Sequence, residues 1–269
     1  MKGPQILLEN EDRLVTKMGG WFPGERVVMR GQDLHVDLVG KMDWMELMVY
    51  AVTGRRFTPA QMKVLNAVWT VISFPEPRIW CNRVTALGGT ARSTCALSIT
   101  AGIATADASI YGQRPIIRAM DFLLRTQRAL DQGAELQEWL KLEIKKYRLV
   151  YGYGRPVATK DERIPHLMRV AREVGLDQGR HIVLVFEIER LLLKDKKNLR
   201  MNIAGLYGAL AADFGFSPQE WGLFTVACFM AGMPPCFLDA ATKQEGSFLP
   251  LRCRRIAYDG APRRAWGNQ

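Results

Sequence analysis

Apolar residues recur along most of this chain with the spacing of an α-helix. In the segment 42–54, Trp44, Leu47 and Ala51 fall on one helical face, and Gly54 suits the C-terminal end of that helix. Similar apolar faces, some of them rich in small residues, predict further helices over 58–73, 115–130, 133–147, 165–175, 181–195, 202–216 and 217–232. The chain is therefore predicted to be mostly α-helical.

Two of these predicted helices begin with a clear N-terminal signal. Thr58 is followed by Pro59, and Ser217 is followed by Pro218. A hydroxyl side chain accepts a hydrogen bond from a free N–H group of the first helical turn. Proline suits the first helical position because it has no N–H group that would need a partner. We expect helices to start at both places.

The segment 82–112 has a different composition, because it is dense in Ala, Gly, Ser and Thr. Small residues let neighbouring helices approach closely, so we expect buried, tightly packed helices here. A flexible linker is the alternative, but Leu, Ile and Val recur throughout the segment and linkers lack them.

One short region has β-type features. In 21–34, turn residues surround an apolar run from Arg26 to Arg30, which predicts a small hairpin. Few other segments alternate with a period of two, and no repeat of fixed period is present. The expected fold class is mostly α with one small N-terminal hairpin.

Length and composition limit the alternatives. The 269 residues are enough for one large domain, or for a large and a small one. Because 48% of them are hydrophobic, disorder is expected only at the ends. No stretch of about 20 apolar residues without charge is present, so no membrane span is expected. The N-terminus lacks the apolar core of a secretory signal.

Cysteine and histidine usage predicts a cytoplasmic protein without a metal site. The five cysteines are dispersed and form no CxxC pair: Cys81, Cys95, Cys228, Cys236 and Cys253. Such a set fits reduced thiols better than a disulfide framework. None of the three histidines pairs with a cysteine or another histidine at the spacing of metal ligands.

The formal net charge of +10 favours anionic ligands in general. Basic residues concentrate at 194–200 and 251–264, where the alternatives are solvated helix ends with a basic tail or docking of an anion. No zinc-finger, RNP or basic-zipper signature is present, so a nucleic-acid partner is not expected.

Five segments, taken in order, carry a family resemblance. Residues 30–62 are similar to an N-terminal hairpin followed by a helix pair written around "YLLLxGxLPT", and 82–112 to two small-residue helices that lead to a catalytic histidine. "GYGRPVATKDER" (152–163) is similar to "GxGHxV…DPR", "NIAGLYGAL" (202–210) to "NVDxxSG", and "LPLRCRRIAYDG" (249–260) to "RPRQxYxG". The chain resembles the citrate synthase superfamily, and in length its short citryl-CoA-lyase-like members.

This resemblance implies a mainly α-helical homodimer of two-domain chains. The large domain would comprise 1–112 and 200–269, and the small domain 113–199, with the loop 151–165. It also implies a CoA thioester and a small carboxylate as substrates, with no covalently bound cofactor. The reaction would be a Claisen-type condensation or its reverse, in a cleft between the domains. In the family, one aspartate takes the α-proton, two histidines act on the carbonyl oxygens, and arginines hold the carboxylates.

At all three catalytic positions of the family, this sequence has another residue. The motifs put Tyr111 at the first histidine, Arg155 at the second and Ala204 at the aspartate. Alanine accepts no proton, and arginine keeps its own, so Arg155 stabilises an anion without cycling a proton. Tyr111 can donate a hydrogen bond to a developing oxyanion. The usual mechanism is therefore not expected from these side chains.

Arginines that hold anions remain. Arg83 matches an "AR" position of the family, where it either binds substrate or bonds carbonyls across the dimer or in the core. Arg163 matches the arginine of "DPR" and could form a two-arginine clamp with Arg155 on a carboxylate. The alternative is an internal ion pair of Arg163 with Asp161 or Glu162.

Two residues near these positions are candidates to replace the missing base. If 107–114 is helical, Asp107 and Tyr111 share a face, Arg114 joins them, and burial would raise the pKa of Asp107. A solvated or capping aspartate is the alternative. Tyr207 is a second candidate, with packing as its alternative. Asn202, at the start of the "NVD"-like stretch, is predicted to bind substrate.

Two hypotheses of function follow. The first is an enzyme that acts on a CoA thioester or a small carboxylate with altered catalytic residues, among them Tyr111, Arg155 and Asp107. The second is a non-catalytic homologue that serves as a ligand sensor or a partner subunit.

Overall fold

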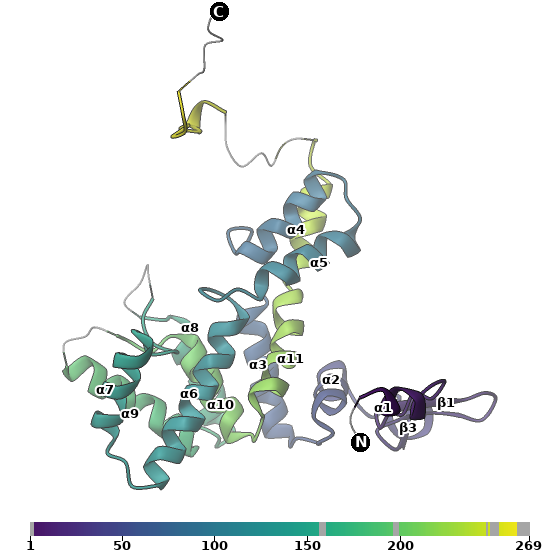
Figure 1. Cartoon of the computed structure of the whole chain (residues 1–269), viewed down its shortest axis with the longest axis horizontal. Coiled ribbons are helices and arrows are strands. Elements are labelled where there is room, and N and C mark those ends of the chain that lie inside the picture. The colour runs from purple at the N-terminus through teal and green to yellow at the C-terminus, as the bar shows by residue number, and fades with distance from the viewer. Residues whose placement is uncertain (1–2, 156–159, 196–198, 246, 248–252, 263–269) are drawn as a thin grey trace, which may run out of the picture. The chain divides into compact units, whose positions relative to one another are not determined.

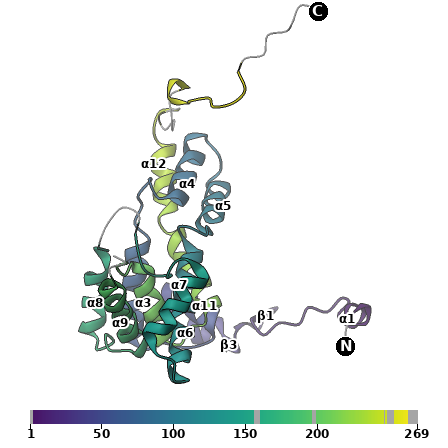
Figure 2. The same ribbon diagram turned by 60° about the vertical axis from the view of Figure 1, so that its left-hand side comes forward.

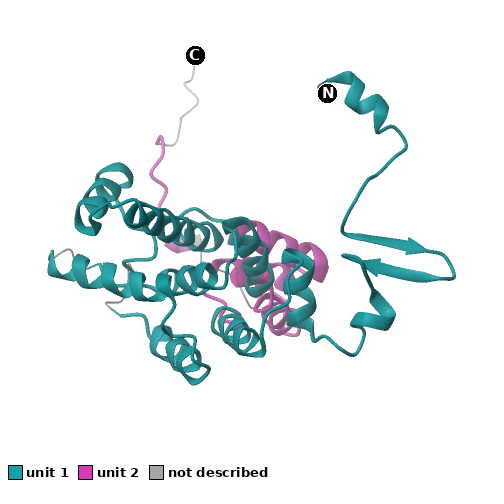
Figure 3. Ribbon diagram, turned by 90° about the horizontal axis from the view of Figure 1, so that it is seen from below, with its two compact units in different colours: residues 1–74, 106–229 teal, residues 75–105, 230–269 magenta. Residues whose placement is uncertain are grey.

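The structure is a computed structural model, which describes residues 3–155, 160–195, 199–245, 247 and 253–262. The chain divides into two compact units, shown in Figure 3. Unit 1 comprises residues 1–74 and 106–229, and unit 2 comprises 75–105 and 230–269. Residues 156–159 of the predicted anion loop and 249–252 of the predicted closing motif lie outside the described residues.

Unit 1 begins with a short helix and a small antiparallel sheet. Helix α1 (Pro4–Glu9) precedes β1 (Gly19–Phe22), β2 (Arg26–Met29), β3 (Gln32–Asp33) and the π-helix η1 (Leu34–Leu38). In the first hairpin Gly19 pairs with Met29 and Phe22 with Arg26. The predicted hairpin is therefore confirmed, and β3 extends it to three strands.

The rest of unit 1 is helical (Figure 1). Its helices are α2 (Trp44–Thr53), α3 (Pro59–Ile72), α6 (Gln113–Asp131), α7 (Leu136–Tyr147), α8 (Arg163–Glu173), α9 (Arg180–Lys194), α10 (Ile203–Asp213) and α11 (Pro218–Met230). The prediction of a mostly α fold is confirmed, and so are the caps. Thr58 forms a capping box with Gln61 at the start of α3, and Gly54 ends α2 in the left-handed conformation, with φ of 73°.

Helix α10 is the centre of the core of unit 1. Nine of its residues are buried, and it packs against α6 on one side and α9 on another. Gly208 makes the contact with α6 possible, because a Cβ there would lie 2.9 Å from the backbone nitrogen of Met120. The small residues of 202–216 therefore let the backbones of α10 and α6 approach closely, as the composition predicts.

Unit 2 contains α4 (Trp80–Thr90), most of α5 (Cys95–Ala106), α12 (Met233–Ala241) and the 3₁₀ turn η2 (Cys253–Arg255). Helices α4 and α12 lie side by side in Figures 1 and 2. The backbones come close at glycines: a Cβ on Gly88 would clash with the Ser98 side chain, and one on Gly89 with the carbonyl of Phe237, at 2.5 Å. Close packing of α4 and α5 is confirmed. The prediction that both are buried is wrong for α5, where Leu97 is 66% exposed.

One helical stretch in the described part of the chain, Pro218–Ala241, is long and apolar enough to cross a membrane by length and composition alone. Of its most apolar window, 44% is buried inside the structure. A helix of a protein core passes the same test, so the stretch alone does not indicate a membrane protein.

The division into compact units differs from the expected domain boundaries. The range 113–199, expected as a small domain, lies entirely in unit 1, where α6 and α9 pack on α10. The units describe how this chain packs on itself. The two domains that the family resemblance implies stay a prediction.

Candidate anion-binding site

A glycine-rich loop of unit 1 is fixed to the start of α10. Tyr153 forms an isolated β-bridge with Met201, the N–H of Asn202 donates to the carbonyl of Gly152 at 2.9 Å, and the N–H of Gly154 donates to the carbonyl of Arg200 at 2.7 Å. Gly152 has φ of +88°, and a Cβ there would lie 2.8 Å from the Cα of Gly205. Only glycine fits such a close contact in that conformation. The glycines of "YGYG" thus place this loop against α10.

Asn202, predicted to bind substrate, caps α10. Its side-chain oxygen accepts from the N–H of Ala204 at 3.0 Å, and its amide nitrogen donates to the carbonyl of Gly154 at 2.9 Å. The side-chain amide of Asn202 therefore links the glycine-rich loop to the first turn of α10. Its role toward substrate stays a prediction.

Asp161 is the centre of the polar contacts beyond the loop. Its side chain has no exposed surface. Oδ2 accepts hydrogen bonds from the N–H of Ile203 and from Nη2 of Arg163, both at 2.8 Å, and Oδ1 accepts from Nε of Arg163 at 2.8 Å. One carboxylate therefore caps the first turn of α10 and pairs with the first residue of α8.

Arg155 approaches the same carboxylate from the loop. Its Nη1 lies 3.8 Å from Oδ1 of Asp161, and it donates to Glu162 Oε2 at 2.7 Å and to the carbonyl of Lys160 at 2.9 Å. We call Arg155, Asp161, Glu162 and Arg163 the arginine cluster. For Arg163 the internal ion pair with Asp161 is confirmed. The two arginines nevertheless come together, as a clamp requires.

The charge state of the cluster follows from its contacts. Burial acts to raise the pKa of Asp161, but the hydrogen bonds and charge of Arg163 and the N–H of Ile203 outweigh it, and the pKa is lowered. The hydrogen bond from Arg155 lowers the pKa of Glu162. Both carboxyls are therefore ionised at neutral pH, and neither can act as a general acid there.

Two tyrosines belong to the surroundings of Arg163. Burial acts to lower the pKa of this guanidinium, but Asp161 raises it, and Tyr207 and Tyr111 add smaller electrostatic contributions in the same direction. Tyr111 is 47% exposed, whereas Tyr207 is 1% exposed. The structure thus brings the predicted residues Arg155 and Arg163 to the same aspartate, and Tyr111 lies within electrostatic reach of Arg163.

The helix expected through Asp107 and Tyr111 is absent. Helix α5 ends at Ala106 and α6 begins at Gln113, and the chain turns back between them with φ of 118° at Gly112. A Cβ on Gly112 would lie 2.3 Å from the carbonyl oxygen of Ala106, so the turn needs glycine. The prediction of a shared helical face for Asp107 and Tyr111 is therefore wrong.

Asp107 and Arg114 do meet, as an exposed ion pair. Oδ1 and Oδ2 of Asp107 accept from Nε and Nη2 of Arg114 at 3.0 and 3.1 Å. The hydrogen bond from Arg114 lowers the pKa of Asp107. The expectation of a raised pKa is wrong, because the carboxylate is half exposed and paired with a cation.

Arg83 lies on α4 in unit 2, where its side chain is exposed. The other six predicted site residues belong to unit 1: Asp107, Tyr111, Arg114, Arg155, Arg163 and Asn202. The role predicted for Arg83 in substrate binding stays a prediction.

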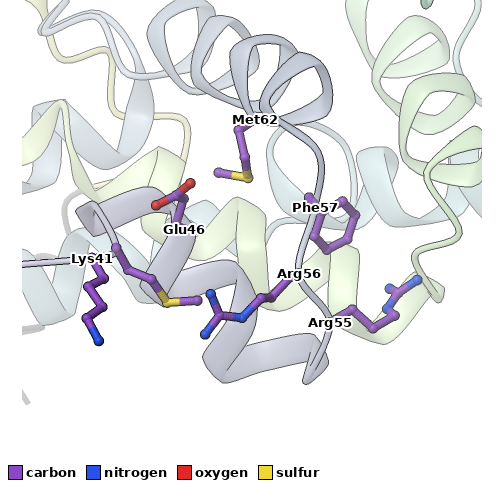
Figure 4. A pocket seen from close by; sticks show the side chains of 7 residues that line it. Lys41, Glu46, Arg55, Arg56, Phe57 and Met62 are labelled. Atoms are coloured by element: carbon purple, nitrogen blue, oxygen red, sulfur yellow. The ribbon is translucent and has the colours of Figure 1, made fainter. Parts of the chain in front are cut away.

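A separate pocket lies near the N-terminal sheet of unit 1 (Figure 4). Its lining combines basic, acidic and apolar side chains: Lys41, Met42, Glu46, Arg55, Arg56, Phe57 and Met62. Two of its basic side chains contact neighbouring elements: Arg55 pairs with Glu220 at 3.1 Å, and Arg56 donates to Gln32 at 2.7 Å. We assign this pocket no ligand.

Within the described residues no group of three His, Cys, Asp or Glu side chains is placed to hold a metal ion. The arginine cluster itself contains two arginines paired with two carboxylates, and Tyr111 and Tyr207 act electrostatically on Arg163. Two guanidiniums supply fixed positive charge, and two phenols supply hydrogen-bond donors. Such a set binds carboxylates and stabilises oxyanions.

The family comparison extends over most of the chain. The family described as "Citrate synthase, C-terminal domain" matches residues 24–235. The chain belongs to the citrate synthase family. The matched range contains the arginine cluster, the Asp107–Arg114 pair and the loop that anchors α10. No curated protein matches the chain by sequence.

Solved structures show the same fold for this member of the citrate synthase family. Citryl-CoA lyase from Hydrogenobacter thermophilus has a TM-score of 0.83 and 19% identity, over 94% of this chain and 97% of that chain. ATP citrate lyase from Methanothrix soehngenii, in complex with citrate and coenzyme A, has a TM-score of 0.76 and 19% identity, over 97% and 45%. Citrate synthase from Thermotoga maritima has a TM-score of 0.58 and 15% identity, over 82% and 60%.

These likenesses establish a citrate-synthase-like fold of the citryl-CoA lyase type. The chain spans less than half of the ATP citrate lyase chain that it matches. Which residues perform chemistry in this protein is a separate question, because the identities are low.

One residue of the site has a larger role than the sequence predicts. The sequence offers Asp161 only as an alternative partner for Arg163, yet it also caps α10 through Ile203. A short-range signal for the ion pair exists, since Asp161 and Arg163 are two residues apart. The contact with Ile203 joins residues 42 positions apart, and only the folded chain shows it.

Proposed function

We propose that this protein binds a small carboxylate at the arginine cluster, together with a CoA thioester, and forms or breaks a carbon–carbon bond between the two. Membership of the citrate synthase family and the citryl-CoA-lyase-like fold support this class of reaction. ATP citrate lyase, one of the proteins with this fold, was solved with citrate and coenzyme A.

The observation that carries the proposal is the position of Arg163 in the arginine cluster. Asp161 engages the Nε–Nη2 edge of the guanidinium, while the side chain as a whole stays 30% exposed. The Nη1 edge makes no hydrogen bond within the described residues, and it can bind a second carboxylate. Arg155 adds a second positive charge beside the same aspartate.

Each side chain then has a definite role in the proposed reaction. Arg163 holds a ligand carboxylate, and Arg155, which shares its charge with Glu162, lies beside the same aspartate. Half-exposed Tyr111 donates a hydrogen bond to an oxyanion that develops on the carbonyl. Proton transfer is not assigned to Asp161 or to Asp107. Both are ion-paired with lowered pKa, which makes them weak bases and keeps them from acting as acids at neutral pH.

A non-catalytic role is the second candidate, and a specific observation favours it. Asp107 was the predicted replacement for the missing base, and the structure ties it to Arg114. Ala204, at the position of the family's aspartate by motif, has no group that accepts a proton. On this alternative the protein binds the same ligands as a sensor or as a partner subunit.

We also propose that the protein is a cytoplasmic homodimer, as the family resemblance implies. Apolar Leu97 on α5 is 66% exposed and Trp80 at the start of α4 is 51% exposed, which is consistent with a covered surface in unit 2. Light scattering coupled to size exclusion should give twice the mass of the chain. A monomer at micromolar concentration would contradict this part of the proposal.

A thermal-shift screen tests the proposed function. The ligands are CoA, acetyl-CoA, other acyl-CoAs, oxaloacetate and citrate, alone and in pairs. A ligand at about 100 times its dissociation constant adds roughly 2.7 kcal/mol of stability. Arg163→Lys should lose the carboxylate-dependent shift, because lysine keeps the charge beside Asp161 and lacks the planar fork.

Arg180→Lys is the matched control. It changes an exposed arginine that pairs with Asp131 at 2.7 Å, and it should keep the full shift. Any ligand that binds then enters a turnover assay by mass spectrometry. Binding with turnover supports the enzyme, binding without turnover supports the second candidate, and no shift with any ligand contradicts both.

A further inference from the structure

The hydroxyl of Tyr207 is buried without a hydrogen-bond partner. The side chain lies on α10 and is 1% exposed, and its oxygen makes no hydrogen bond within the described residues. An unsatisfied buried hydroxyl costs about 1–3 kcal/mol, and most buried polar side-chain atoms are paired. The unpaired hydroxyl of Tyr207 in the core of unit 1 therefore needs a physical explanation.

Other buried tyrosines of unit 1 show that the fold can satisfy this group. The hydroxyl of Tyr153 donates to the carbonyl of Val185 at 2.7 Å, and that of Tyr50 donates to the carbonyl of Arg30 at 3.3 Å. Phenylalanine would fill the position of Tyr207 without an unpaired oxygen. The hydroxyl is therefore not a requirement of packing.

The charges near Tyr207 indicate what kind of group would pair with it. Tyr207 follows Ile203 by four residues on α10, so the two share a helix face, and the N–H of Ile203 donates to Asp161, the partner of Arg163. Burial raises the pKa of the phenol, and the opposing effect of the Arg163 charge is smaller, so the group stays protonated at neutral pH and acts as a donor. Asp161 already accepts hydrogen bonds from Ile203 and Arg163. Arg163 and the Tyr207 hydroxyl are thus two donors on the side of α10 that Asp161 contacts, and within the described residues the hydroxyl has no acceptor.

We propose that Tyr207 is a ligand-binding residue whose hydroxyl donates a hydrogen bond to the carboxylate that Arg163 holds. The inference rests on the proposed function, since it assigns a second donor to the same carboxylate. The ligand enters from the exposed side of Arg163 and supplies the acceptor that the hydroxyl lacks. Tyr207 stands where the motif "NVDxxSG" has serine, so the larger side chain carries the hydroxyl further from α10.

Calorimetric titration of the full chain with citrate and with oxaloacetate tests this assignment. In Tyr207→Phe the affinity for the carboxylate should fall about 10- to 100-fold, as expected for loss of a hydrogen bond to a charged group. The affinity for CoA, measured in parallel, should not change. The melting temperature without ligand should stay the same or rise, because an unpaired hydroxyl is removed.

Tyr50→Phe is the matched control. It removes a bonded hydroxyl from a tyrosine that is 5% exposed and lies on α2, so it should lower the melting temperature and leave carboxylate affinity unchanged. Tyr207→Met is a second variant without the hydroxyl and should repeat the loss of affinity if Tyr207→Phe folds poorly.

The outcomes separate the inference from the function on which it rests. Wild-type binding with equal affinity in Tyr207→Phe overturns the inference and leaves the proposed function standing. A parallel fall in CoA and carboxylate affinity, or a loss of stability like that of Tyr50→Phe, also overturns it. If the wild type binds no carboxylate with or without CoA, the proposed function fails and the inference fails with it.

Discussion

Two aspartate–arginine pairs of unit 1 have the same geometry and very different surroundings. In both pairs two carboxylate oxygens accept from Nε and Nη2 of one arginine. The side chain of Asp161 is completely buried and that of Arg163 is 30% exposed, whereas Asp107 and Arg114 are 49% and 52% exposed. The carboxylate of Asp161 also accepts a hydrogen bond from the first turn of α10. Among the described contacts, the carboxylate of Asp107 caps no helix.

The comparison shows that burial, more than hydrogen-bond geometry, decides what a pair does. An exposed pair contributes about 0–1 kcal/mol, because water and salt compete with it. Removing one partner of a buried pair costs about 3–5 kcal/mol, because an uncompensated charge stays inside. Asp161 therefore organises the arginine cluster, and Asp107, the first residue after α5, does little more than pair with Arg114 on α6.

The largest effect is expected for Asp161→Asn. The change leaves the Arg163 charge without its partner, so the free energy of unfolding should fall by about 3 kcal/mol or more. Urea denaturation measures it. Asp131→Asn, in the exposed pair with Arg180, is the control and should stay within about 1 kcal/mol of the wild type. Equal effects of the two changes would contradict the comparison.

Gly152→Ala tests whether the glycine loop holds the buried pair in place. The new Cβ meets Gly205 at 2.8 Å and the backbone has φ of +88°, so a loss of about 2–4 kcal/mol is expected. Gly133→Ala is the matched control, because Gly133 has φ of +90° and nothing within 4 Å of the new Cβ. That variant should lose only about 1 kcal/mol of unfolding free energy. A loss in Gly152→Ala no larger than in the control would show that the loop can move away from α10.

Low pH should remove the stabilisation that ionised Asp161 gives to the folded protein. The pKa of Asp161 is lowered in the folded protein, so its ionisation stabilises the fold fully above its usual unfolded pKa. That contribution is lost as pH falls through the lower folded pKa. Unfolding free energies of the wild type and Asp161→Asn should therefore differ most at neutral pH and converge in acid. Parallel curves down to pH 3 would mean that this carboxylate carries no such linkage.

The smallest effect is expected for Asp107→Asn. Both side chains of its pair are about half exposed, and the free energy of unfolding should change by less than about 1 kcal/mol. Arg114→Gln and the double variant complete a cycle, whose coupling energy should shrink in 1 M salt. A coupling above about 2 kcal/mol that survives salt would make the exposed pair resemble the buried one and remove the contrast.

Local signals of the sequence predicted the fold well where neighbours in the chain decide it. Thr58 with Gln61 starts α3, Ser217 with Glu220 starts α11, and Gly54 ends α2. Such signals act within three or four residues, so they are readable without the structure. These signals do not predict helix α12, because Pro234 and Pro235 in its first turn resemble a helix break, although proline is tolerated there.

The candidate site was predictable in its parts and less so in its contacts. The motif reading placed Arg155 and Arg163 in one anion-binding loop, and the structure brings both to Asp161. It also assumed that the helix before Tyr111 continues through Asp107. The chain instead turns at Gly112 against the carbonyl of Ala106, a contact that no helical periodicity reveals.

The sequence by itself determined the helical composition, most helix ends and the presence of two arginines in a glycine loop, because periodicity, capping and turn residues act over a few positions. Only the tertiary structure decided that Asp161 is buried under α10 while Asp107 stays in water, and that Tyr207 keeps an unpaired hydroxyl in the core. Burial and electrostatics depend on what distant segments bring to a side chain. A carboxylate, a guanidinium or a phenol therefore receives its role from the folded chain.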